Sequence, residues 1–162
     1  MKRILFLSMI CLGLAAAIVQ AGDEKPWLDP ENCDMCTNMM AQPGLLEHMK
    51  MENLNVGSGM ISLVTVDPEF QAAYATAYAG MQKSGEKMMA GEEMNLCGCC
   101  TDIGALMTAG AKMDNLPTAN GSVMLLSSTD PKLVEKIHAH ADRTNAEMAA
   151  MMESGHHDGH KH

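Results

Sequence analysis

Two stretches of the chain carry the alternation of turn residues and short apolar runs that is typical of β-hairpins. The runs at residues 60–66 and 123–127 are rich in β-branched and apolar side chains, and Gly-Ser-Gly or Asn-Gly precedes each of them. The segments before these turns, residues 46–54 and 108–116, are the natural partner strands. The pattern therefore predicts two hairpins.

A helix is predicted after each hairpin. The dipeptides at Asp67 and Asp130 place a capping residue before a proline, which is the usual start of a helix. Apolar residues then recur at close to helical spacing, namely Phe70, Tyr74, Ala77 and Met81 in the first segment and Leu133, Ile137, Ala141 and Met148 in the second. We expect these apolar faces to cover a sheet.

The landmarks occur twice in the same order, which indicates an internal repeat. Cys-x-x-Cys-Thr begins at Cys33 and again 64 residues later, Met-acid-Asn-Leu begins at Met51 and again 62 residues later, and Asp-Pro recurs after 63 residues. One hairpin with one helix can hardly bury its own apolar face, so two such units are expected to combine.

The predicted fold class is α+β, with two tandem ββα-type repeats in a single domain over residues 22–150. The repeats, at about 29–82 and 93–150, would form a four-stranded antiparallel sheet covered by helices, with an approximate twofold axis. We interpret residues 83–93 as the linker between repeats and residues 151–162 as a disordered, His-rich tail.

The N-terminus has the pattern of a cleavable secretory signal. Basic residues precede an uncharged apolar run at residues 4–19, which is short for a membrane span. The small side chains at Val19 and Ala21 favour cleavage after Ala21. Lipid attachment at Cys11 is disfavoured, because Ile10 occupies the position where a lipoprotein signal needs a small residue. We therefore expect a periplasmic or secreted protein with no transmembrane segment in the mature chain.

The charge of the chain disfavours some classes of partner. The formal charge of −9 would become −11 after loss of Lys2 and Arg3 with the signal, and such an acidic chain repels nucleic acid and anionic lipid. Aromatic residues make up only 3% of the chain, so Met, Leu, Val, Ile and Ala must build the core.

The mature chain would keep five cysteines, whose spacing is that of a metal site. Two Cys-x-x-Cys pairs can place four thiolates around one soft or borderline ion. The predicted metal ligands are Cys33, Cys36, Cys97 and Cys100, with Cys99 or a nearby methionine completing or replacing one of them. A cap-then-proline signal at Asp29 indicates that the first pair lies in the opening turn of a short helix, which would lower its thiol pKa.

Two other interpretations of the cysteines remain open. In an exported protein the same pairs can form structural disulfides within an interaction module that binds no metal. Their spacing is also that of a thiol–disulfide exchange site. This is the one enzymatic alternative, because the sequence has no phosphate-binding glycine loop, Gly-x-Ser-x-Gly or His-Glu-x-x-His motif. The odd fifth thiol, Cys99, fits poorly with a purely structural role.

Methionine and histidine add soft and borderline ligands. Methionines cluster beside the cysteines, at Met35, Met39, Met40, Met88, Met89 and Met94, and their thioethers suit Cu(I), although methionine is also a flexible core filler. A possible weak second site is the tail, with His156, His157, His160 and His162. His138 and His140 are two residues apart on a predicted helix and should not share a metal.

The sequence as a whole therefore predicts an exported protein that binds Cu(I) first and Zn(II) second, for buffering, transfer or sequestration of the metal. Its mixture of export signal, paired cysteines, methionines and histidines is similar in composition to periplasmic copper-handling proteins. Its expected partners are the metal ion and, for transfer, another exported metal-handling protein.

Overall fold

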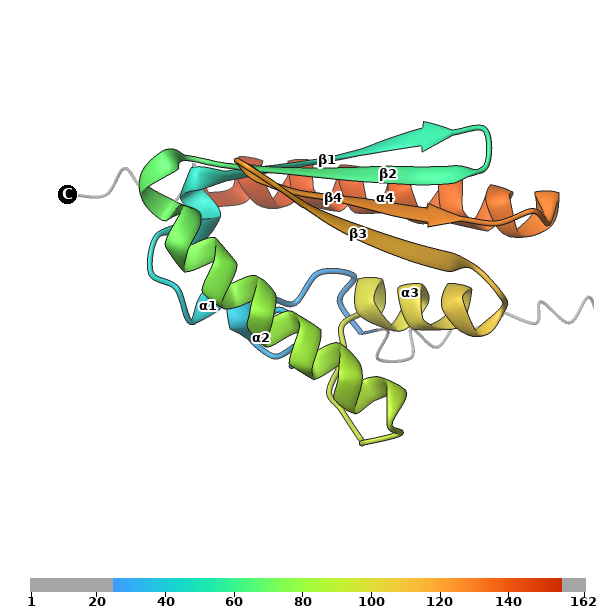
Figure 1. The fold of residues 1–162 in the computed structure, drawn as a ribbon, viewed down its shortest axis with the longest axis horizontal. Helices are drawn as coiled ribbons and strands as arrows, with labels where there is room; N and C mark the ends of the chain where they lie inside the picture. The colour runs from blue at the N-terminus through green and yellow to red at the C-terminus, as the bar shows by residue number, and fades with distance from the viewer. Residues whose placement is uncertain (1–24, 156–162) are drawn as a thin grey trace, which may run out of the picture.

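A computed structural model describes residues 25–155 and shows a four-stranded antiparallel sheet with helices packed on it (Figure 1). This confirms the predicted α+β class. The elements are α1 (Thr37–Met40), η1 (Leu45–His48), β1 (Met49–Val56), β2 (Gly59–Val66), η2 (Pro68–Phe70), α2 (Gln71–Met89), α3 (Gly98–Thr108), β3 (Lys112–Thr118), β4 (Gly121–Ser127) and α4 (Pro131–Gly155). Within the described range, a search for helices with the length and apolar character of a membrane span finds none.

Both predicted hairpins are present, and they meet along their second strands. The strand order is β1-β2-β4-β3, and every neighbouring pair is antiparallel. The first strand of each hairpin starts later than predicted, at Met49 and at Lys112. The residues before Met49 form the 3-10 turn η1. Of the residues before Lys112, Thr108 ends α3, a helix that the sequence pattern did not predict, and residues 109–111 connect α3 to β3.

Two glycines permit the close pairing of the central strands. Gly59 and Gly121 have φ values of 152° and 144°, in a region that side chains with a Cβ rarely adopt. A Cβ at Gly59 would lie 2.0 Å from the carbonyl oxygen of Leu126, and one at Gly121 would lie 2.1 Å from that of Val64. The contact between the two hairpins therefore requires glycine at both positions.

The core lies on one face of the sheet in two clusters. In the larger one, Met60 and Leu126 from the central strands pack with Leu106 of α3 and with Leu133 and Ile137 of α4. In the smaller one, α2 and η1 pack on β2 through Leu45, Val66, Tyr74 and Ala77. Leu133, Ile137 and Ala141 are all buried, as the helical spacing predicted. In Figure 1, α4 runs along the length of the sheet.

The hydroxyl of Tyr74 on α2 is hydrogen-bonded to the hydroxyl of Ser122 on β4, and both residues are buried. We expect Tyr74→Phe to lower the free energy of unfolding by about 1–2 kcal/mol at pH 7, because the Ser122 hydroxyl would lose its partner. Burial raises the pKa of Tyr74 above its ordinary value. The native state therefore holds this proton more tightly, and the linked stability is present below about pH 10 and lost as the pH rises further.

Urea unfolding of wild type and Tyr74→Phe at pH 7 and in alkaline buffer tests this. The alkaline loss of stability should be smaller in the variant, which has no phenol to ionise. Equal stability of the two proteins at pH 7 would contradict the expected role of the Tyr74–Ser122 hydrogen bond.

The two Asp-Pro signals have different outcomes. The Asp130 side chain caps α4, because its Oδ1 accepts a hydrogen bond from the backbone N–H of Lys132 at 3.0 Å. Asp67 is the N-cap residue of η2, but its side chain makes no capping hydrogen bond and instead contacts His48, with Oδ2 and Nδ1 2.9 Å apart. The His48 ring also stacks on Phe70 at 4.1 Å. His48, which had no evident partner in the sequence, therefore has two.

Two segments are more helical than predicted. α2 continues through Lys83 to Met89, into the predicted linker, because Lys, Glu and Met favour helix strongly enough to outweigh Gly85. α4 ends at Gly155, so it includes Met151, where we predicted the tail to begin. The predicted signal peptide and the four tail histidines lie outside the described residues.

Candidate metal centre

The first cysteine pair lies in a series of turns that leads into α1. The backbone N–H of Cys33 donates to the carbonyl oxygen of Asp29 at 3.0 Å, and Cys36 is the N-cap residue of α1. The sequence predicted that the pair occupies the opening turn of the helix. In the structure the pair instead precedes the helix. Because α1 has only 4 residues, its dipole contributes little to the thiols.

The second cysteine pair begins α3. Cys97 is the N-cap residue and Cys100 lies in the first turn, so their three-residue spacing directs both side chains to one side of the helix. The backbone N–H of Thr101 donates to the carbonyl oxygen of Cys97 at 3.0 Å and closes this first turn.

Hydrogen bonds between Asp34 and Asn95 join the two cysteine segments. The backbone N–H of Asp34 donates to the carbonyl oxygen of Asn95 at 2.8 Å, and the backbone N–H of Asn95 donates to Oδ2 of Asp34 at 2.8 Å. The Asn95 side chain also donates to the carbonyl oxygen of Asn32 at 2.6 Å. These bonds fix the distance between the two pairs.

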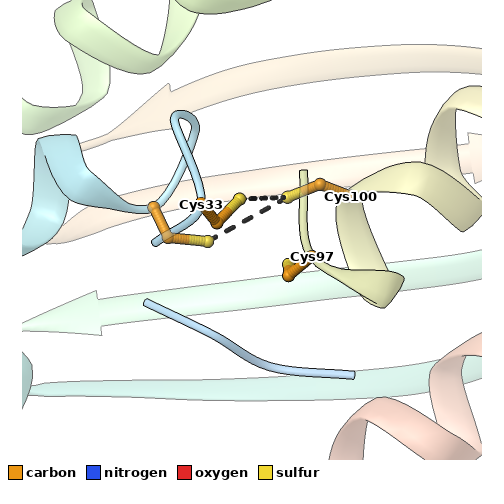
Figure 2. Close-up of side chains that lie close together, drawn as sticks. Cys33, Cys97 and Cys100 are labelled. Carbon is orange, nitrogen blue, oxygen red and sulfur yellow. Dashed lines mark hydrogen bonds between the residues drawn. The ribbon is translucent and has the colours of Figure 1, made fainter. Parts of the chain in front are cut away.

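The structure brings Cys33, Cys36, Cys97 and Cys100 together. Their Sγ atoms all lie within 4.8 Å of one another, and Cys33 and Cys97 are only 1% and 3% exposed. The Sγ of Cys100 is 3.7 Å from that of Cys33 and 4.0 Å from that of Cys36, and Figure 2 shows Cys33 and Cys100 pointing toward each other. Tetrahedral coordination at a metal–sulfur distance of about 2.3 Å places sulfurs about 3.8 Å apart. The four cysteines can therefore hold one metal ion.

None of the cysteines that the structure describes is in a disulfide. All five, from Cys33 to Cys100, are free thiols. The separations at Cys100 are well beyond the sulfur–sulfur bond of about 2.05 Å.

The electrostatics favour one thiolate among neutral thiols. The Cys100 thiol donates a hydrogen bond to the sulfur of Cys36 and lowers the pKa of Cys36 to about 6. The same hydrogen bond, together with burial, raises the pKa of Cys100. Burial also raises the pKa of Cys33. Cys36 is therefore the thiol most readily ionised near neutral pH, whereas Cys33 and Cys100 would lose their protons as an ion binds.

Cys99 and several predicted methionines lie elsewhere. The Sγ of Cys99 is outside the group of four and 3.8 Å from Nε2 of His140, and burial raises the pKa of Cys99 to about 12. Met39 packs against the smaller core cluster and so contributes to the core. Met89 is 72% exposed.

No sequence pattern pointed to the residues that position the site. Asp34 and Asn95 are 61 positions apart, and neither belongs to a metal-binding motif. The contact of Cys99 with His140 likewise depends on how α3 and α4 pack. Only the Cys-x-x-Cys spacing identified the site in advance.

Comparison of the chain with protein-family models, curated proteins and solved structures finds no match. The geometry of the site is therefore the basis of the functional proposal.

We expect Asn95→Ala to weaken metal binding about tenfold while the protein stays folded, because residues that orient ligands typically contribute tenfold or more to metal affinity. The side chain removed contacts the Asn32 carbonyl and not a sulfur. Competition of the protein with a chromophoric chelator measures the affinity. Asn115→Ala, at an exposed position on β3, is the matched control and should bind as wild type does. Equal affinity of all three proteins would show that the hydrogen bonds of the Asn95 side chain do not position the thiols.

Proposed function

We propose that this protein is an exported metal-handling protein that binds one thiophilic ion at Cys33, Cys36, Cys97 and Cys100 and buffers, transfers or sequesters it. The observation that supports this most strongly is the approach of four sulfurs, from two segments distant in sequence, to within 4.8 Å of one another. Thiolate-only ligand sets select Cu(I), Zn(II) or iron–sulfur clusters over harder ions.

Cu(I) is our first choice of ion and Zn(II) the second. Zn(II) would use all four thiolates in a closed tetrahedron. Cu(I) is the softer ion and is satisfied by fewer thiolates, which would leave one sulfur available to begin exchange with an acceptor. Since Met39 packs against the core and Met89 is exposed, the choice of Cu(I) depends less on methionine than the sequence suggested.

Titration of the purified, reduced protein tests the proposal. We expect the four-cysteine centre to take up about one equivalent of Cu(I) or Zn(II), with protection of these four cysteines from alkylation, read peptide by peptide. Competition with a chelator of known affinity, carried out for each ion, shows whether the protein binds Cu(I) more tightly than Zn(II). Binding that is equally tight after all four are replaced by serine would overturn the proposal. Thiols that are already blocked before reduction would favour the disulfide-linked interaction module.

A thiol–disulfide exchange role is the second candidate, because the pKa of Cys36 is lowered to about 6. The Cys36 thiolate would attack a substrate disulfide and release one thiolate, and Cys33 would then resolve the mixed disulfide to give a Cys33–Cys36 disulfide and the second thiol. Insulin reduction that is lost in Cys36→Ser would support this role. We expect no such activity from the metal-loaded protein.

A further inference from the structure

The fifth cysteine contacts a histidine that the metal centre does not use. Cys99 lies on α3 between the two ligands of the second pair, and its Sγ is 3.8 Å from Nε2 of His140 on α4. His140 is only 3% exposed. The pair is thus a soft sulfur and a borderline nitrogen facing each other at the junction of the two helices.

The other ring nitrogen of His140 is held by a carboxylate. Nδ1 of His140 and Oδ2 of Asp102 are 2.8 Å apart. Since the carboxylate accepts, Nδ1 carries a proton, and in the neutral imidazole Nε2 is the nitrogen with the free lone pair, on the side of Cys99. This carboxylate–histidine arrangement is the one that metal-ligating histidines use to fix their tautomer and orientation.

Thr144 and Trp27 lie beside His140, the first hydrogen-bonded to its backbone and the second against its ring. The hydroxyl of Thr144 donates to the carbonyl oxygen of His140 at 2.8 Å and accepts a hydrogen bond from Nε1 of Trp27 at 3.1 Å. The Trp27 ring lies 5.3 Å from that of His140, centroid to centroid. The Asp102 hydrogen bond and the Trp27 ring therefore hold the imidazole of His140 in place beside Cys99.

The separation of the two atoms suits a shared metal ion. With metal–sulfur and metal–nitrogen distances of about 2.3 and 2.05 Å, ligands at a trigonal angle are about 3.8 Å apart. This is the separation of Cys99 Sγ and His140 Nε2 in the structure. Two ligands leave at least one coordination position unfilled. A cavity of about 390 Å³ lies on the His140 side of the pair, lined by His140, Asp102, Trp27, Leu106 and Arg143.

A nucleophilic thiol with a histidine base is the rival interpretation of the same residues. Acyl transfer would need backbone donors for an oxyanion beside the sulfur. At the start of α3, however, the N–H of Gly98 already donates to the carbonyl oxygen of Pro26, and the N–H of Cys99 donates to that of Trp27, both at 2.9 Å. Metal ligation needs no such donors.

We propose that Cys99 and His140 form a second metal site, separate from the four-cysteine centre and of low coordination number. It would take a thiophilic d10 ion such as Cu(I), with Asp102 as the residue that positions His140. Cys99 precedes Cys100 directly, so an ion held here could pass to the four-cysteine centre by ligand exchange, without a change of oxidation state. The site binds metal whether or not the neighbouring centre is filled.

Nuclear magnetic resonance of the histidine rings in the ¹⁵N-labelled full chain, titrated with Cu(I) under anaerobic conditions, tests this. By two equivalents we expect the His140 Nε2 resonance to shift to that of a metal-bound nitrogen, while Nδ1 keeps its proton. Cys99→Ser should abolish the shift at the same metal concentration. Asp102→Asn should raise the free Cu(I) needed for it by about 10- to 100-fold.

His138→Gln is the matched control on the same helix, because Nε2 of His138 instead donates to the carbonyl oxygen of Val56 at 2.9 Å. It should leave the titration of His140 unchanged. An unshifted His140 Nε2 at two equivalents, or a shift that persists in Cys99→Ser, would overturn the second site. Protection of the four clustered thiols is read separately, so failure of the four-cysteine centre and failure of this site are distinguishable.

Discussion

Replacing Cys100 by serine is expected to weaken metal binding about 100-fold or more. Binding of a structural ion by four such ligands contributes about 10–16 kcal/mol, so one ligand accounts for about 3 kcal/mol, which is a factor of about 100. Cys100 is the most informative position, because its sulfur lies 3.7 and 4.0 Å from those of Cys33 and Cys36. The affinity is measured by competition with a chelator, with the protein reduced.

Cys99→Ser, one residue away, is the control for this prediction. It removes a thiol that lies outside the group of four, so the affinity of the four-cysteine centre for its ion should stay at the wild-type value. Equal loss of affinity in the two variants would mean that α3 as a whole had been disturbed. Wild-type affinity in Cys100→Ser would show that Cys100 is not a ligand.

Gly59→Ala should lower the free energy of unfolding by about 3 kcal/mol or more. The new Cβ would lie 2.0 Å from the carbonyl oxygen of Leu126, which is backbone and cannot move without disturbing the pairing of β2 with β4. Both cysteine segments are attached to elements that pack on this sheet. The variant should therefore lose stability and metal binding together, measured by urea unfolding and metal titration on one preparation.

Gly57→Ala, in the turn of the same hairpin, is the matched control. A Cβ at Gly57 would meet no atom within 4 Å, so its stability should stay within about 1 kcal/mol of wild type. If Gly59→Ala were as stable as Gly57→Ala, the junction of the two hairpins would have to tolerate a Cβ that this geometry excludes.

The sheet and its packing helices were predictable because their signals are local. A turn before an apolar run predicts a hairpin, and residues such as Leu133 and Ile137 recur at the period of the helix that buries them. α3 gave a weaker signal, because its first turn contains Cys99, Cys100 and Thr101, whose helix propensity is low. It is stabilised by tertiary contacts, notably burial of Leu106 in the larger core cluster.

The candidate site likewise has one part that was predictable from sequence and one part that was not. The spacing within each pair predicted which sulfurs could share an ion, and the structure brings those four together. The sequence could not show that Asn95 and Asp34 would join the two segments, or that Cys99 would face His140. Such contacts depend on the packing of elements far apart in the chain, and no local pattern encodes them.

X-ray absorption spectroscopy of the protein loaded with one equivalent of Cu(I), or separately of Zn(II), is the most direct test of the four-cysteine centre. The account predicts a first shell of sulfur alone, three or four atoms at about 2.3 Å, with no nitrogen or oxygen ligand. A shell dominated by nitrogen or oxygen, or a spectrum unchanged after replacement of the four clustered cysteines, would contradict it.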